Sequence, residues 1–276
     1  MGIAREAAPE IDRLVLFVRK LGPQQDARLA KLARACGLES LELLPNFGDF
    51  LLEGVLTNEL AILRMPYSTP DKVLGRLDEL EGKRLIEKRE TGLAATPDLR
   101  PLLEAMAAAW TEVAAAAWGG HREDLTTATD AAGIVGRAAS DDHVVAVVHR
   151  ELPEPTDPHH LLEHRLVTLR LVRQHDHVAA WKARGLTAPA TVLLTKLWQA
   201  DSLADRLVDP GEGLTHLIEL GLVEADPLSL TARGREVRDA IEAETNQRAQ
   251  QTFDVLDEAA GVDFLAALRH LPGNTG

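Results

Sequence analysis

Residues 217–231 contain a helical stretch followed by two short apolar stretches, reading Leu217-Ile218-Glu219-Leu220, Leu222-Val223-Glu224 and Leu228-Ser229-Leu230-Thr231. The first group has its apolar residues at helical spacing, whereas the second and third groups have the short alternation of strands. Asp226-Pro227 lies between them and indicates a tight turn. The sequence therefore predicts a helix, a two-stranded hairpin and then a further helix from Gly234 onward.

The same order of elements occurs earlier in the chain, offset by about half of its 276 residues. The earlier passage reads Leu77-Asp78-Glu79-Leu80, Leu85-Ile86-Glu87 and Leu93-Ala94-Ala95-Thr96, and a helical run begins at Leu99. Recognition helix, two-stranded wing and trailing helix form the order of a winged helix-turn-helix. The predicted fold class is therefore mainly α with small β wings, as tandem winged helix-turn-helix units joined by long helices. The predicted domains are an N-terminal unit over 1–120, a connector over 121–158 and a C-terminal unit over 159–276.

Composition narrows the class of protein. No apolar run reaches the roughly 18 residues that a bilayer span needs, and the charged N-terminus lacks a signal-peptide core, so we expect a cytoplasmic protein. A single cysteine, Cys36, excludes an internal disulfide and a cysteine-rich zinc site. The 30 basic and 43 acidic residues give a net charge of −13, which argues against indiscriminate nucleic-acid binding but allows a local basic surface.

A tight turn leads into the first predicted recognition helix, over 71–81. The turn Pro66-Tyr67-Ser68-Thr69-Pro70 offers hydroxyls that can cap a helix and a proline that suits its first position. Cations in this helix and in the wing over 85–95 would reach phosphates and base edges. The predicted DNA-binding residues are Ser68, Thr69, Lys72, Arg76, Lys83, Lys88 and Arg89. Four nearby glutamates oppose them, so a solvated surface of mixed charge is the alternative.

The second predicted recognition helix, at about 211–220, is acidic instead. From Asp205 to Glu224 there are five acidic residues, and Arg206 is the only permanent cation in the sequence of that stretch. Phosphates would repel such a helix. We therefore expect the second unit to be structural, ligand-binding or partner-binding.

Tryptophans are the candidate contacts for a ligand, because aromatic residues make up only 4% of the chain. They are Trp110, Trp118, Trp181 and Trp198. Each one either walls an apolar pocket or fills the core with its indole N–H bonded to one acceptor.

Eight of the ten histidines fall between residues 121 and 177, which raises a metal hypothesis. His160 and His164 are four residues apart and so share one helix face. Neither a cysteine cluster nor a His-Glu-x-x-His motif accompanies them, and surface or hydrogen-bonded histidines are the commoner explanation. The sequence therefore predicts no metal and no cofactor.

The junction between the second wing and its following helix resembles that of the multiple-antibiotic-resistance regulator (MarR) family. It reads Leu228-Ser229-Leu230-Thr231-Ala232-Arg233-Gly234-Arg235, followed by Val237-Arg238-Asp239-Ala240-Ile241-Glu242. Residues 173–180 and the C-terminal third also resemble actinobacterial helix-turn-helix proteins. The resemblance implies paired wings for two DNA half-sites and a small-molecule pocket between the DNA-binding lobe and the pairing helices. The chain departs from the family in lacking an Asp-x-Arg element at either wing tip and in being about twice the usual length, as a fused pseudo-dimer would be.

These observations together predict a bacterial DNA-binding transcriptional regulator that is not an enzyme. Its expected partners are double-stranded DNA and a small apolar or aromatic ligand, and it would act as a monomeric pseudo-dimer or as a homodimer. One alternative is a winged-helix scaffold that binds a ligand or a protein without reading DNA. The other is a metal-dependent enzyme that uses the central histidines.

Overall fold

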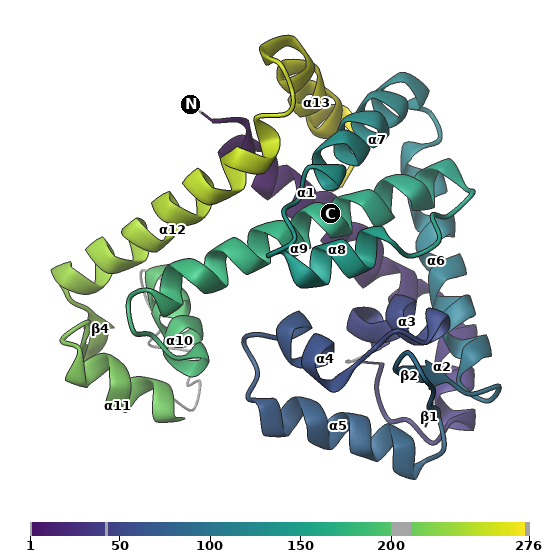
Figure 1. Ribbon diagram of the computed structural model, residues 1–276, viewed down its shortest axis with the longest axis horizontal. Helices are drawn as coiled ribbons and strands as arrows, with labels where there is room; N and C mark the ends of the chain where they lie inside the picture. The colour runs from purple at the N-terminus through teal and green to yellow at the C-terminus, as the bar shows by residue number, and fades with distance from the viewer. Residues whose placement is uncertain (1, 42–43, 200–210, 274–276) are drawn as a thin grey trace.

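The computed structural model describes residues 2–41, 44–199 and 211–273, and this part of the chain is mainly helical with two small pairs of antiparallel strands (Figure 1). The elements are α1 (Ile3–Gln25), α2 (Ala27–Ala35), α3 (Leu44–Glu53), α4 (Asn58–Arg64), α5 (Pro70–Gly82), β1 (Ile86–Lys88), β2 (Leu93–Ala95), α6 (Arg100–Trp118), α7 (Arg122–Arg137), α8 (Val144–Arg150), α9 (Pro158–Lys182), α10 (Ala188–Gln199), α11 (Gly211–Glu219), β3 (Val223–Ala225), β4 (Leu228–Leu230), α12 (Ala232–Phe253) and α13 (Glu258–His270). No helix in these ranges is both long and apolar enough to span a bilayer.

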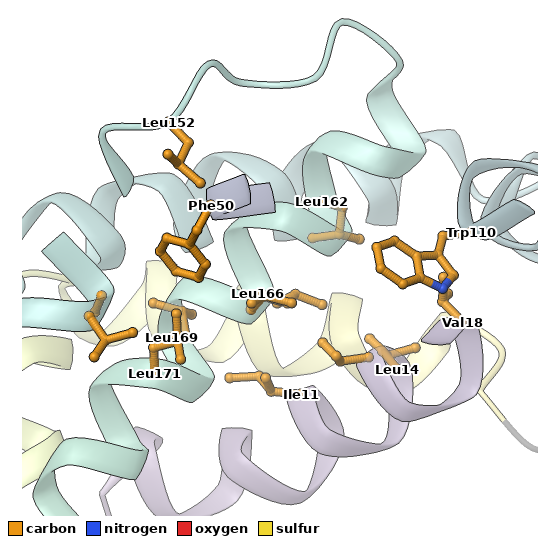
Figure 2. Packing of buried hydrophobic residues seen from close by; sticks show 14 of the residues in the cluster. Ile11, Leu14, Val18, Phe50, Trp110, Leu152, Leu162, Leu166, Leu169 and Leu171 are labelled. Carbon is orange, nitrogen blue, oxygen red and sulfur yellow. The ribbon is translucent and has the colours of Figure 1, made fainter. Parts of the chain in front are cut away.

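Helix α9 runs through the centre of the main hydrophobic core. Asp157 caps its start by accepting hydrogen bonds from the amides of His159 and His160, and Pro158 occupies the first helical position. Buried apolar residues occur all around α9 rather than along one stripe, because α1, α6, α7, α8 and α12 pack on different sides of it. Figure 2 shows side chains of α1, α3, α6 and α9 meeting in this core.

Residues 44–118 form the N-terminal helix-wing segment, which contains α3 to α6 and the hairpin β1–β2. The register pairs Ile86 with Ala95, and the amide of Leu93 also bonds to the carbonyl of Leu56, which extends the hairpin by one bridge. A residue with positive φ, Arg84, separates α5 from the wing. Thr96 then closes the wing: its amide bonds to the carbonyl of Leu85 at 2.9 Å, and its hydroxyl donates to the carbonyl of Arg84 at 3.0 Å.

Residues 188–199 and 211–253 form the C-terminal helix-wing segment, with α10, α11, the hairpin β3–β4 and α12. Gly221, again with positive φ, separates α11 from the wing. Thr231 closes the wing through its amide, 3.1 Å from the carbonyl of Leu222, and through its hydroxyl, 2.9 Å from the carbonyl of Gly221. The same hydroxyl accepts a bond from the amide of Gly234 and so caps α12.

Both predicted hairpins are present, each preceded by a helix, but two helix boundaries differ from those that the sequence pattern predicts. Apolar spacing predicts a single helix over Leu51 to Leu63, whereas the structure has two helices, α3 and α4, because Gly54 adopts a φ of 70° and Thr57 caps a new start. The pair Gly22-Pro23 predicts the end of the first helix, but α1 continues to Gln25. The apolar run over 144–148 is compatible by sequence with a buried strand or a helix turn, and it belongs to α8.

The hydrophobic core does not stop at residues 120 and 158, where domain boundaries were predicted. Residues 121–158 contain α7 and α8, which pack on α9, and their apolar side chains belong to the main core with those of α1 and α13. A second, smaller core joins the end of α9 to the C-terminal helix-wing segment. The predicted division into two units and a connector thus stays a prediction, while the packing joins the connector to the main body.

Candidate nucleic-acid interface and ligand cavities

The turn before α5 leaves polar groups free at the start of that helix. Thr69 occupies the N-cap position, but its side chain accepts no capping hydrogen bond from the first turn, and Pro70 follows it. Ser68 uses its amide to bond to the carbonyl of Met65 at 3.0 Å. Both residues line a cavity. The sequence predicts that the hydroxyl of Ser68 or of Thr69 caps the helix, and neither does so. An uncapped helix start with nearby hydroxyls is a suitable contact for a phosphate.

The exposed face of α5 carries a free lysine and a paired arginine. Lys72 is exposed and has no ion-pair partner among the described residues, whereas Arg76 lies 3.0 Å from Glu79. Lys83 contacts the same Glu79 at 2.7 Å and also donates to the carbonyl of Gly37. Hydrogen bonds from Lys83 and then Arg76 lower the pKa of Glu79. Salt bridges this exposed contribute little, so these cations can exchange a carboxylate for a phosphate at small cost.

The wing carries two more of the predicted cations, and both are paired. Lys88 lies 3.2 Å from Glu81, and Arg89 lies 2.8 Å from Glu87. The seven predicted DNA-binding residues therefore lie along one continuous stretch of turn, helix and wing. Their charges are nearly balanced by their neighbours, which agrees with the predicted alternative of a mixed-charge surface as well as with DNA contact.

The corresponding surface of the C-terminal helix-wing segment is acidic. Glu219 of α11 and Glu224 of β3 are exposed, and His216 donates a hydrogen bond from Nε2 to the carbonyl of Gly185 at 2.9 Å. Two exposed cations of this segment, Arg233 and Arg235, lie at the start of α12. Arg206, the one cation predicted for this helix region, lies outside the described residues.

Of the four tryptophans proposed as ligand contacts, only Trp198 lines either of the two cavities described below. Trp110 and Trp118 fill the main core, where the indole of Trp118 donates to the carbonyl of Pro272 at 2.8 Å and the guanidinium of Arg19 lies over the ring of Trp110. Figure 2 shows Trp110 among the core side chains. Trp181 is buried in the smaller core. The proposed aromatic site is therefore revised, because three of the rings pack where the helices meet.

Two cavities lie on either side of α9, and each is large enough for a small molecule, since such sites usually exceed roughly 300 Å³. The first, about 840 Å³, lies between the α4–α5 turn, the start of α10 and the second half of α11. The second, about 770 Å³, lies between α1, α4, α9, α10 and α12. Trp198 is 39% exposed at the rim of the second cavity, where its indole donates to Asp239 and the guanidinium of Arg238 lies over its ring.

The central histidines contact different partners and do not form one cluster. His164 stacks on His149 with ring centroids 4.3 Å apart, and burial lowers the pKa of His164 to about 3. Nδ1 of His177 lies 2.7 Å from the hydroxyl of Tyr67, within hydrogen-bonding distance, and burial lowers the pKa of His177 to about 4. His160 does not join His164 in a ligand set, and no group of three or more candidate ligands within the described ranges is arranged to hold a metal ion.

Sequence reasoning did not assign a ligand-binding role to the polar residues of the second cavity, among them Arg64, Tyr67, Arg173, Arg238 and Glu242. One signal was available for Arg64. It is the only charged residue in the apolar run from Leu60 to Pro66, where a cation is unexpected.

The fold and this surface define a helix-turn-helix protein with two β wings. Residues 83–273 match the model of the helix-turn-helix family, and since this is more than half of the chain, the protein belongs to that family. The match includes the whole described C-terminal helix-wing segment but only the wing and α6 of the N-terminal one. No curated protein and no solved structure matches the chain. The motif that names the family is of a DNA-binding type.

Proposed function

We propose that the protein is a DNA-binding transcriptional regulator, that its N-terminal helix-wing segment contacts double-stranded DNA, and that a small ligand modulates the contact. The observation that carries this proposal is the α4–turn–α5 arrangement. It brings together an uncapped helix start, the half-buried residues Ser68 and Thr69 and the exposed cation Lys72, unpaired among the described residues, within one turn and the first turn of α5. Membership of a helix-turn-helix family supports the same partner.

The two helix-wing segments are, in this proposal, related units that make one chain a pseudo-dimer of the MarR-like kind. Two matched sets of hydrogen bonds support the relation. Thr96 and Thr231 each close their wing through one amide bond and one hydroxyl bond, to the residues that follow α5 and α11. In both segments the second residue after the recognition helix has positive φ. A second copy of the chain would be needed for DNA binding only if one chain makes too few contacts with the DNA.

The placement of the two helices would allow a ligand to change the position of α5. Figure 1 shows α5 and α11 along the same lower edge of the molecule, with the 840 Å³ cavity lined by residues near the starts of α5 and α10 and by residues of α11. A ligand that fits one separation of these helices better than another would shift the population of the two arrangements. That coupling is how a small apolar or aromatic molecule would change DNA affinity.

Salt-dependent binding to genomic DNA fragments tests the proposal. The double variant Lys72→Ala/Arg76→Ala should flatten the log–log dependence of affinity on salt by about 0.9 for each phosphate that the variant no longer neutralises. The matched control removes two exposed arginines of α7, Arg122→Ala/Arg137→Ala, on a helix remote from α5 in Figure 1. The control should keep the wild-type slope. An equal slope in wild type and the Lys72/Arg76 variant would remove α5 from DNA contact.

A second candidate function is a winged-helix scaffold that binds a ligand or a protein without reading DNA. The pairing of Arg76, Lys83, Lys88 and Arg89 with glutamates favours it, as does the net charge of −13. Wild-type protein without salt-dependent DNA binding would establish this candidate over the first. A catalytic role is not part of either proposal, since domains of the helix-turn-helix type are typically non-enzymatic.

A further inference from the structure

The second cavity combines apolar walls with an unusual concentration of arginines. It takes residues from α1, α4, α9, α10 and α12 and has a volume of about 770 Å³. Its apolar lining comes mainly from α1, α9 and α12: Ala8, Ile11, Val167, Leu171, Ala249 and Phe253. Five arginines also line it: Arg5, Arg64, Arg170, Arg173 and Arg238. Three acidic residues accompany them: Asp12, Asp239 and Glu242.

Most of these arginines at the cavity already have carboxylate partners. Arg170 lies 2.5 Å from Asp12, and Arg173 and Arg238 lie 2.8 and 2.6 Å from the two carboxylate oxygens of Glu242. The Nε of Arg238 is buried without a hydrogen-bond partner in the described part of the chain, although Nη1 of the same guanidinium donates to Glu242. Two carboxylates, Asp12 and Glu242, thus pair with three arginines, so some guanidinium N–H groups at the cavity have no carboxylate partner among the described residues.

Arg64, the last residue of α4, has no such partner. Its side chain is buried, with 9% of the residue exposed, and its guanidinium makes no hydrogen bond or ion pair within the described part of the chain. Burial lowers the pKa of Arg64 to about 9, and the charges of Arg19 and Arg170 lower it further than Asp49 can offset. It therefore remains a cation near neutral pH. A buried cation without a partner is costly, and an anion bound beside it would offset that cost.

The nearby carboxylate of Asp49 does not pair with Arg64, because it contacts other groups. Its carboxylate lies 3.4 Å from the guanidinium of Arg19 and 3.7 Å from Nε2 of His149. Two further polar side chains of the cavity wall, Tyr67 and His177, bond to each other. His177 is neutral at pH 7, because burial lowers its pKa to about 4, so it adds no further positive charge.

We propose that this cavity binds a monocarboxylate with an apolar body, whose carboxylate pairs with Arg64 while its hydrocarbon part packs on the walls of α1, α9 and α12. The guanidinium of Arg64, which is buried and unpaired within the described ranges, matches one carboxylate in charge and in its two-pronged geometry. A dianionic phosphate ester would bring a second negative charge close to Asp12 and Glu242, which disfavours it.

The site lies where it can influence the recognition helix, and this consequence rests on the proposed function. Gln174 of α9 donates to the backbone carbonyl of Arg64 at 3.1 Å, and Tyr67 in the following turn bonds to His177. Five residues then separate Arg64 from the start of α5 at Pro70. A ligand held by Arg64 would fix the end of α4 against α9, and with it the position of α5.

Binding of octanoate, measured without DNA by calorimetry and thermal unfolding, tests the site itself. Wild-type protein should bind octanoate and gain stability from it, while uncharged octan-1-ol should bind at least about tenfold more weakly and octyl phosphate should bind more weakly than octanoate. Arg64→Met should unfold at a higher temperature than wild type when no ligand is present, because it removes an unpaired buried charge. The same variant should bind octanoate about ten- to a hundredfold more weakly.

The matched control is Lys182→Met, which removes an exposed cation from the lining of the other cavity. It should bind octanoate as wild type does. Absence of octanoate binding to wild type, equal binding of octan-1-ol, or unchanged binding by Arg64→Met would each overturn the proposal. A final arm measures DNA affinity with and without octanoate. Octanoate binding without any DNA binding would contradict the proposed function and leave the carboxylate site standing.

Discussion

The N-terminal and C-terminal helix-wing segments share a backbone arrangement and differ in the charge of their surfaces. Both close the wing with a threonine, Thr96 or Thr231, and in both the second residue after the recognition helix has positive φ. The exposed face of α5 carries Lys72 and Arg76, whereas α11 carries Glu219. The hydrogen bonds that form the hairpin constrain few side chains outside it. The outward positions are therefore free to carry opposite charges on the same framework.

The segments also differ in how closely the wing approaches the following helix. Gly234 lies three residues after Thr231, and a Cβ added there would collide with the carbonyl oxygen of Leu222. Three residues after Thr96, the N-terminal segment has Leu99, which is fully buried. The start of α12 thus approaches the backbone of its wing closely, whereas the matching position before α6 holds a large buried side chain.

The largest expected effect comes from Gly234→Ala. The added methyl group has no space, so the C-terminal helix-wing segment should lose about 2–3 kcal/mol of unfolding free energy. Hydrogen exchange should speed up in α11, β3 and β4 while the main core keeps its protection. Gly120→Ala, whose added carbon would have nothing within 4 Å, is the control. Equal destabilisation by both substitutions would contradict the close approach of α12 to its wing.

Acid should destabilise the main core before the smaller one. His164 is buried, and its pKa is lowered to about 3 in the folded protein, against about 6.5 in the unfolded chain. Between these two pH values this histidine is protonated in the unfolded chain and neutral in the folded protein. Stability is therefore present at neutral pH and declines as the pH falls, by about 2 kcal/mol at pH 5 from this residue. Denaturant titrations at pH 7 and pH 5 measure the loss.

The variant His164→Phe keeps a ring beside His149 and removes the titrating group, so it should reduce the loss at pH 5. His270→Gln, at an exposed histidine, should leave the loss unchanged. The one histidine in the described part of the C-terminal segment, His216, is half-buried, so exchange there should respond less to acid. A pH-independent difference between wild type and His164→Phe would show that the ring acts only through packing.

The smallest effects should come from Thr96→Ala and Thr231→Ala. Each substitution removes a hydroxyl that bonds to a carbonyl at the wing junction, and Thr231→Ala also removes the cap on α12, so each should cost about 1 kcal/mol. Equilibrium unfolding of both variants measures the two costs side by side. A negligible cost at one threonine and a full cost at the other would break the proposed equivalence of the two segments.

The sequence predicted those features that depend on local patterns. Residues 71–81 and the two wings follow from apolar spacing, Pro70 and the threonines. The split between α3 and α4 was missed because a single glycine in a helical pattern usually only weakens a helix, and the φ of 70° at Gly54 accompanies the bridge between Leu56 and Leu93.

The candidate site was predicted only in part, because burial depends on contacts between distant segments. Lys72 and Arg76 lie on an exposed helix face as expected, and helical spacing accounts for the pairing of Glu79 with Arg76 and Lys83. The pair of Lys88 with Glu81 depends instead on how the wing folds against α5. Trp110 and Trp118 could be pocket or core on sequence alone, and the packing of α6 against α1 buries both. Arg64 becomes a ligand candidate only when α9 and α12 enclose it, more than 100 residues away in sequence.

In the proposed function, DNA contacts the N-terminal helix-wing segment and not the C-terminal one. The most direct test compares DNA affinity, at several salt concentrations, of Lys72→Ala/Arg76→Ala with that of Arg233→Ala/Arg235→Ala, which removes two exposed cations from the start of α12. The first variant should bind DNA more weakly and with a flatter salt dependence, and the second should bind as wild type does. Weaker binding by the Arg233/Arg235 variant alone would contradict this placement and assign the DNA contact to the C-terminal segment.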